Sequence, residues 1–145
     1  MDMKEIADLK EGFVSRKVYS IYAACMFDPT WEKFCGKADG FLRDPEVSVF
    51  GYRENDVPVG VIVVRKCGNV AEICGIAVNK ADRGRGIGGH LIRYVMEYLS
   101  PDVLTAETDD DAVEFYRKCG FRTEAFTAAY DGGTCRRYRC ILRKG

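Results

Sequence analysis

Apolar residues recur along this chain with two different periods, and each period predicts one type of secondary structure. Over residues 9–26 they recur every three or four positions, which is the spacing of an amphipathic helix. The same spacing predicts helices over residues 30–42, 86–99 and 109–119. Gly120 follows the last of these helices where a left-handed C-terminal cap would lie.

Shorter runs that alternate in hydropathy, or that are rich in β-branched residues, predict strands. They occupy residues 47–54, 59–67, 70–78, 103–106, 122–130 and 135–142, and residues 4–8 are a candidate for an additional strand. The first two runs form a hairpin around residues 55–58, and the last two form a closing hairpin around residues 131–133. The run 70–78 is apolar on both faces except at Glu72, so a strand buried on both sides is expected.

The order of these elements predicts the fold class. It reads α-α-β-β-β-α-β-α-β-β, which makes a mixed α/β sheet with an antiparallel first half and one βαβ crossover. No internal repeat, linker or shift in composition divides the chain, so residues 1–145 are expected to form a single domain.

Composition narrows the class of protein. The chain is 47% hydrophobic and 30% charged, as globular proteins are, and its net charge of +0 gives no reason to expect a nucleic-acid partner. The seven cysteines form no CxxC pair and the one histidine, His90, is distant from them, so no metal site is expected. A polar N-terminus and the lack of an apolar run of roughly 18 residues predict a cytoplasmic protein without a membrane partner.

The segment over residues 78–90 carries the strongest chemical signal. It lies between a predicted strand and a predicted helix, and it holds four glycines within residues 84–89. Amide groups at the positive N-terminal end of a helix bind anions, and glycine lets the backbone approach the ligand closely. Lys80, Arg83 and Arg85 add positive charge. A ligand that carries phosphate is expected here, because a plain surface turn needs only one glycine.

Two phosphate-binding motifs fit this segment. Residues 84–89 satisfy G-x-G-x-x-G, the dinucleotide fingerprint, and Glu107 stands about 20 residues further on. However, arginines crowd the loop and the chain lacks a second βαβαβ half. The segment also satisfies R/Q-x-x-G-x-G/A, with Arg83, Gly86 and Gly88 at the defining positions. A nucleotide-dependent oxidoreductase stays an alternative, whereas a Walker A loop is excluded by the missing Gly-Lys-Ser/Thr.

Residues 78–90 resemble the signature loop of the GCN5-related N-acetyltransferase (GNAT) family, and the resemblance extends over nearly the whole chain. It implies an acyl-CoA N-acyltransferase fold with acetyl-CoA as cosubstrate. The pantetheine arm would then lie along Ile76, Ala77 and Val78. The pyrophosphate would be held by Arg83, Gly84, Arg85, Gly86, Ile87, Gly88 and Gly89.

A second segment, residues 108–121, is similar to the family motif A-x-x-F-Y-x-x-x-G-F. The resemblance assigns further cofactor contacts to Asp109, Ala112 and Phe115. Many family members carry Asn where Asp109 stands, and an ionised Asp cannot donate the hydrogen bond that Asn gives to pantetheine. Asp110 and Asp111 are interpreted as favourable charge at a helix N-terminus.

Two residues are candidates for catalysis. The resemblance assigns Tyr116 as the general acid, and a phenol with a pKa of about 10 stays protonated at neutral pH and can donate to a thiolate. Glu72 lies eleven residues before Arg83, the spacing of the catalytic glutamate in the histone acetyltransferase branch. On its strand face it neighbours Cys74 and Ile76, and apolar surroundings would raise its pKa towards that of a useful base. Ordered water is the alternative base.

The favoured function is therefore an acetyl-CoA-dependent N-acetyltransferase that passes acetyl directly to a primary amine in a ternary complex. A non-catalytic acyl-CoA sensor or interaction module is the alternative from another class of protein. The acceptor is expected to be a small-molecule or peptide amine. Six acidic residues and no basic one lie between residues 99 and 114, which favours a cationic acceptor. Apolar residues of the closing hairpin leave a homodimer contact open.

Overall fold

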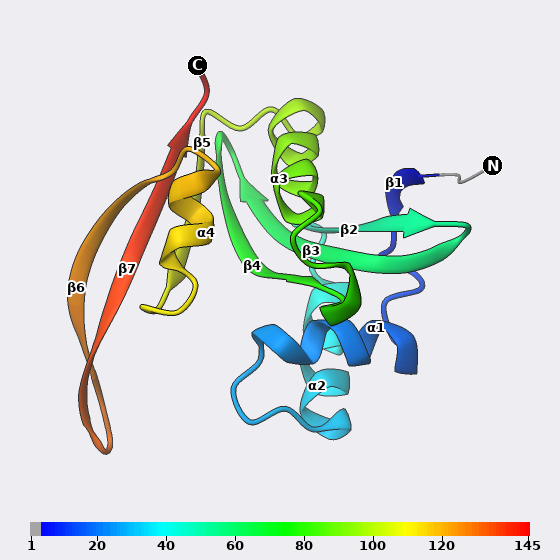
Figure 1. Cartoon of the computed structure of the whole chain (residues 1–145). Helices are drawn as coiled ribbons and strands as arrows, with labels where there is room; N and C mark the ends of the chain where they lie inside the picture. The colour runs from blue at the N-terminus through cyan, green and yellow to red at the C-terminus, as the bar shows by residue number, and fades with distance from the viewer. Residues whose placement is uncertain (1–3) are drawn as a thin grey trace.

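The computed structural model describes residues 4–145, and its strands form one seven-stranded sheet in the order β1-β2-β3-β4-β5-β7-β6 (Figure 1). The strands are β1 (Lys4–Asp8), β2 (Val47–Glu54), β3 (Val57–Cys67), β4 (Val70–Val78), β5 (Val103–Thr108), β6 (Arg122–Tyr130) and β7 (Gly133–Arg143). The helices are α1 (Arg16–Tyr22), α2 (Trp31–Arg43), α3 (Ile87–Tyr98) and α4 (Val113–Lys118), with 3-10 turns η1 (Ala23–Cys25) and η2 (Lys80–Asp82). The β4-α3-β5 crossover is parallel and the other pairings are antiparallel, so the predicted mixed sheet is confirmed, including its strand at residues 4–8.

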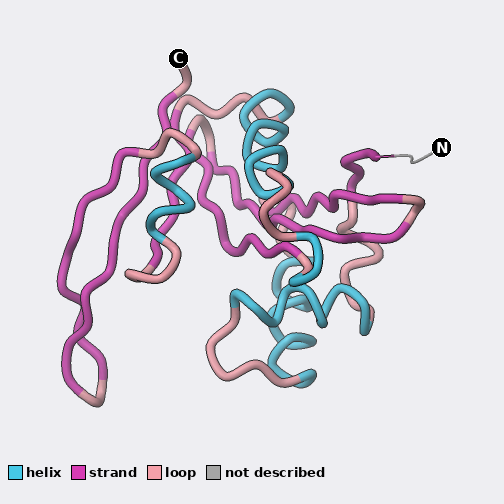
Figure 2. Tube along the Cα trace, in the orientation of Figure 1, coloured by secondary structure: helices cyan, strands magenta, loops and turns pink. Residues whose placement is uncertain are grey.

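Helices cover both faces of the sheet. Side chains of α1 and α2 pack on one face in a buried cluster that includes Val18, Phe34 and Val63. Helices α3 and α4 cover the other face, where Leu91 and Leu104 belong to a second buried cluster. Figure 2 shows that the β6–β7 hairpin extends beyond the helices. No helix within residues 4–145 is long and apolar enough to cross a membrane.

The first predicted helix is shorter than its sequence pattern indicates. It begins at Arg16 and not at residue 9, because the Ser15 hydroxyl accepts the Val18 N–H at 3.0 Å and so caps the helix there. Residues 9–15 form a loop that carries Phe13 into the core, where it is fully buried. The apolar spacing over these residues thus reflects the burial of side chains in the core, although the backbone there is not helical.

The last predicted helix also begins later than expected, at Val113. The Asp109 carboxylate accepts the backbone N–H groups of residues 111 and 112 at 3.0 and 3.1 Å, which makes a turn ahead of the helix. The end of the helix is as predicted. Gly120 has φ +94°, and the Phe121 N–H donates to the Tyr116 carbonyl at 3.0 Å, a left-handed C-terminal cap.

Strands β4 and β5 pair along only part of their length. Their register joins residues 70–72 to residues 103–105, and beyond that point the strands diverge, as Figure 1 shows. A β-bulge at Cys74 accompanies the divergence, because Val63 opposes Gly75 while its neighbour Val64 opposes Ile73. Residues 75–78 keep their pairing with β3 on one edge and leave the other edge open.

Candidate active site

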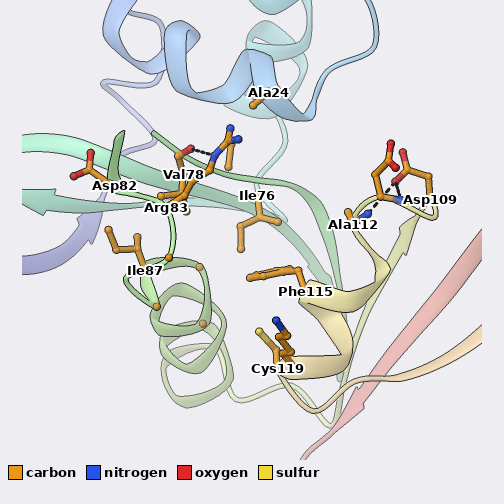
Figure 3. Close-up of a pocket in the computed structure, with 17 residues that line it drawn as sticks. Ala24, Ile76, Val78, Asp82, Arg83, Ile87, Asp109, Ala112, Phe115 and Cys119 are labelled. Atoms are coloured by element: carbon orange, nitrogen blue, oxygen red, sulfur yellow. Dashed lines mark hydrogen bonds between the residues drawn. The ribbon is translucent and has the colours of Figure 1, made fainter. Parts of the chain in front are cut away.

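Two cavities open where β4 and β5 diverge. The first, of about 800 Å³, lies between the end of β4, the start of α3 and helix α4 (Figure 3), and we call it the glycine-loop cavity. The second, of about 460 Å³, lies between η1, β4, β5 and β7, and we call it the Tyr116 cavity. The residues that line both are Ala24, Ile76, Asp109, Ala112 and Phe115. A ligand in one cavity can therefore touch a ligand in the other.

The residues expected to contact a phosphate-bearing ligand gather in the glycine-loop cavity. With the exception of Arg85, all of them line it: Ile76, Ala77, Val78, Arg83, Gly84, Gly86, Ile87, Gly88, Gly89, Asp109, Ala112 and Phe115. They come from two segments about 20 residues apart in sequence, and the fold brings these segments together around one cavity. Their contacts with a cofactor stay a prediction.

The start of α3 offers this cavity a set of unsatisfied amides. Gly84 and Gly86 have φ of +81° and +79°, left-handed conformations that residues other than glycine adopt at a cost. The first backbone hydrogen bond of the helix runs from the His90 N–H to the Gly86 carbonyl at 3.0 Å. The amides of residues 87–89 precede it, so they have no acceptor within the helix. Such a helix end binds phosphate.

The arginines of the loop differ in what they do. Arg85 donates to both Glu54 and Asp82 at 2.8 Å, and the hydrogen bond with Glu54 raises its pKa further above the usual range. It therefore ties the loop to β2 and does not line the cavity, contrary to the sequence-based expectation. Arg83 lines the cavity, and its Nε donates to the Val78 carbonyl at 3.1 Å. Its remaining guanidinium donors make no hydrogen bond within residues 4–145.

One cationic side chain of the cavity was missed from the sequence. Lys118 lies at the end of α4 and lines the glycine-loop cavity together with Cys119. It stands three residues after Phe115, a spacing that puts both on the same side of a helix. This spacing is a signal that could have identified it.

Tyr116 lines the second cavity. Its ring packs edge-on between Phe115 and Phe121, with centroids 5.1 and 5.2 Å away, and the residue is 6% exposed. Burial raises the pKa of its hydroxyl well above the usual range, so the phenol is protonated at neutral pH. Its hydroxyl makes no hydrogen bond within residues 4–145.

Glu72 does not have the apolar surroundings that the sequence pattern predicts. Its side chain is 57% exposed, 4.0 Å from Arg65 and outside both cavities. The bulge at Cys74 is the reason, because it ends the regular alternation between Glu72 and the cavity-lining residues beyond it. Glu107, which follows the same sheet face on β5, lines the Tyr116 cavity instead.

Tyr22 and Cys25, from the α1–η1 segment, lie at one side of the Tyr116 cavity. A Cβ at Gly75 would lie 2.1 Å from the Tyr22 hydroxyl oxygen, so this position beside the bulge must be glycine for α1 to pack there. Cys25, which lines the cavity, donates to the Tyr22 carbonyl at 3.2 Å. Burial raises the pKa of the Cys25 thiol to about 11 and also raises that of Cys74. Both are thiols at neutral pH, and thiols are weak nucleophiles.

The loop before α4 is fixed by more than charge at a helix end. Asp110, expected to act only through such charge, accepts a hydrogen bond from the buried Tyr138 hydroxyl at 2.6 Å. This bond joins β7 to the segment that carries Asp109 and Tyr116. It therefore links the walls of the two cavities.

Both the sequence and the fold are similar to those of known proteins. Residues 14–121 match the profile of the acetyltransferase (GNAT) family. The chain is 31% identical over 86 residues to UPF0157 protein YqkA of Bacillus subtilis (strain 168), and this match covers 57% of the chain but only 25% of YqkA. The ribosomal-protein-S18-alanine N-acetyltransferase of Escherichia coli has the same fold, with a TM-score of 0.75, 16% identity and coverage of 97% and 94% of the two chains. A GNAT family acetyltransferase from Elizabethkingia anophelis with acetyl-CoA bound also has this fold, with a TM-score of 0.69, 19% identity and coverage of 97% of this chain and 98% of the other.

Proposed function

Because the chain belongs to the acetyltransferase (GNAT) family, we propose that it is an N-acetyltransferase that moves acetyl from acetyl-CoA to a primary amine. The observation that carries this proposal is the meeting of two cavities at the open edge of β4, with Tyr116 lining the second. An oxidoreductase is disfavoured, since Glu107, the acid of the dinucleotide motif, lines the Tyr116 cavity and not the glycine-loop cavity.

The residues of the glycine-loop cavity fit acetyl-CoA. The amides of residues 87–89, with Arg83 and Lys118, suit its phosphates. The open edge of β4 at residues 76–78 offers backbone groups that can pair with the amides of pantetheine, as a strand would. The Asp109 carboxylate acts as a hydrogen-bond acceptor for two amides, and a carboxylate has no donor to offer this ligand. When bound, acetyl-CoA supplies a thioester whose carbonyl carbon an amine can attack.

Tyr116 supplies the proton that the reaction needs. Attack by the amine forms the C–N bond and breaks the C–S bond, so CoA leaves as a thiolate. The Tyr116 hydroxyl, protonated at neutral pH and free of other hydrogen bonds within the described chain, donates to that sulfur. Direct transfer requires no acyl-enzyme, in keeping with the protonated state of Cys25 and Cys74.

The acceptor amine must also lose a proton. A primary amine with a pKa of about 10 is mostly ammonium at neutral pH and is then no nucleophile. Glu107 lines the acceptor side of the site and is unpaired within residues 4–145, so we assign to it the acceptance of this proton, directly or through water. Glu72, the sequence-based candidate, lies outside the cavity.

Glu107→Gln is therefore expected to lower kcat/KM for the amine about 100-fold at neutral pH, the typical effect of losing a general base. Glu72→Gln is the matched control, because Glu72 pairs in register with Thr105 and so lies on the same sheet face. It should leave kcat/KM unchanged. If Glu72→Gln lowers kcat/KM and Glu107→Gln does not, then Glu72 and not Glu107 is the base.

A thiol-release assay with acetyl-CoA and a panel of primary amines tests the proposed function. We expect CoA release that depends on both substrates, with mass spectrometry showing the acetylated amine. If no amine releases thiol while CoA raises the melting temperature of the protein, the chain is a CoA-binding sensor and the proposal is wrong.

A further inference from the structure

Arg137 lines the Tyr116 cavity, and its guanidinium has no partner within residues 4–145. Arg137 lies on β7, is half-buried, and lines the cavity with Glu107, Thr108 and Tyr116. Within residues 4–145 it forms no hydrogen bond, ion pair or ring contact. A half-buried charge of this kind has lost part of its hydration and gained no acceptor in return.

Two other arginines, Arg65 and Arg139, do have partners. Arg65, also half-buried, donates to Asp44 at 3.0 Å. Arg139, two residues along the same strand and on the same sheet face, lies over the Phe126 ring at 5.3 Å. Neither lines the Tyr116 cavity. Arg137 differs from both, because it is half-buried, has no partner within residues 4–145 and lines the cavity, where a ligand can supply the acceptor.

The carboxylate of Glu107 lines the same cavity but does not neutralise the charge of Arg137. Glu107 opposes Arg139 in register and is diagonal to Arg137 on the same sheet face. Glu107 also lacks a hydrogen bond or ion pair within the described chain. Two opposite charges therefore line one small cavity and do not contact each other. Asp109, which also lines this cavity, accepts the two amides of its own turn through Oδ1.

We propose that the acceptor is a small amine that also carries a carboxylate, which Arg137 binds while Glu107 faces the amine. This inference rests on the proposed function and adds the chemical class of its acceptor. A planar guanidinium holds a carboxylate through two parallel N–H···O bonds, which a neutral group cannot form. A cavity of about 460 Å³ has the size of a small-molecule site. The acidic segment 99–114 alone favours a cation, and Arg137 changes this to a substrate that bears both charges.

The test compares pairs of amines that differ only in that charge. Amino acids with increasing separation of amine and carboxylate are each assayed beside their carboxamide, with acetyl-CoA in excess. The wild type should prefer the carboxylate member by about 10- to 100-fold in kcat/KM, chiefly through KM. Arg137→Gln should erase this preference by raising KM for the carboxylate member of each pair. Arg139→Gln, the matched control on the same face, should keep it.

The outcomes separate this inference from the proposed function. Equal turnover of carboxylates and carboxamides by the wild type, or a preference that survives in Arg137→Gln, overturns the inference and leaves the acetyltransferase intact. A preference for a peptide with an internal Asp and an amidated C-terminus over the free amino acids overturns the small-molecule class. If no amine turns over, calorimetry of the same pairs in the presence of CoA decides the inference, and loss of turnover counts only against the proposed function. Thermal unfolding checks that each variant is folded. Arg137→Lys is included as a conservative variant that keeps the positive charge.

Discussion

Tyr116→Phe is expected to lower kcat about 100- to 10,000-fold, the range over which a positioned general acid contributes to rate. The variant keeps the ring, so its packing between Phe115 and Phe121 is retained. It also breaks no hydrogen bond within residues 4–145, because the hydroxyl makes none there. Stability and acetyl-CoA affinity should therefore stay at the wild-type level. Steady-state kinetics and calorimetry with CoA measure the two effects separately.

The pH dependence sharpens this test. Burial raises the pKa of the Tyr116 hydroxyl, so its deprotonation moves to higher pH and the wild-type rate should not fall between pH 7 and about 10 for want of the acid. Tyr94→Phe is the control, since its ring packs on Phe50 and Tyr98, outside both cavities. It should behave as the wild type. A Tyr116→Phe enzyme with normal kcat would end the acid role.

Gly88→Ala is expected to weaken acetyl-CoA binding about tenfold or more. A Cβ at this position would lie 2.8 and 2.9 Å from two ring carbons of Phe115, closer than real Cβ atoms come. Because the ring and the first turn of α3 both line the glycine-loop cavity, either displacement changes the surface that receives the cofactor. Overpacking of this kind costs about 1–3 kcal/mol, and each 1.4 kcal/mol lost from binding is a factor of ten in Kd. Calorimetry with CoA measures the change.

Gly36→Ala is the matched control for this substitution. Gly36 is within α2, and a Cβ there would meet nothing within 4 Å. The exchange should leave the Kd for CoA unchanged and stabilise the fold by about 0.5–1 kcal/mol, because alanine loses less backbone entropy than glycine in a helix. Wild-type CoA affinity in Gly88→Ala would show that the Phe115 ring yields without disturbing the cavity.

Features that depend on residues close together in the chain could be predicted from the sequence alone. Hydrophobic periods located the sheet strands and the helices α2 and α3, since the period reports which side of an element is buried. The glycines of residues 84–89 marked the loop before α3, and Gly120 marked the left-handed end of α4. The motif over residues 108–121 identified Phe115 and Tyr116, of which Phe115 lines both cavities and Tyr116 lines the second.

The charged groups that face the cavities could not be identified without the folded arrangement of the strands. The bulge at Cys74 and the divergence of β4 from β5 leave Glu72 in solvent and bring Glu107 to the Tyr116 cavity. Arg85 turns away because Glu54, far off in sequence, supplies its partner. Arg137 enters the cavity wall through the pairing of β7 with β5. A charged side chain is positioned by its partners and by strand register, which join residues distant along the chain, whereas helices, turns and caps are specified by residues that are close together.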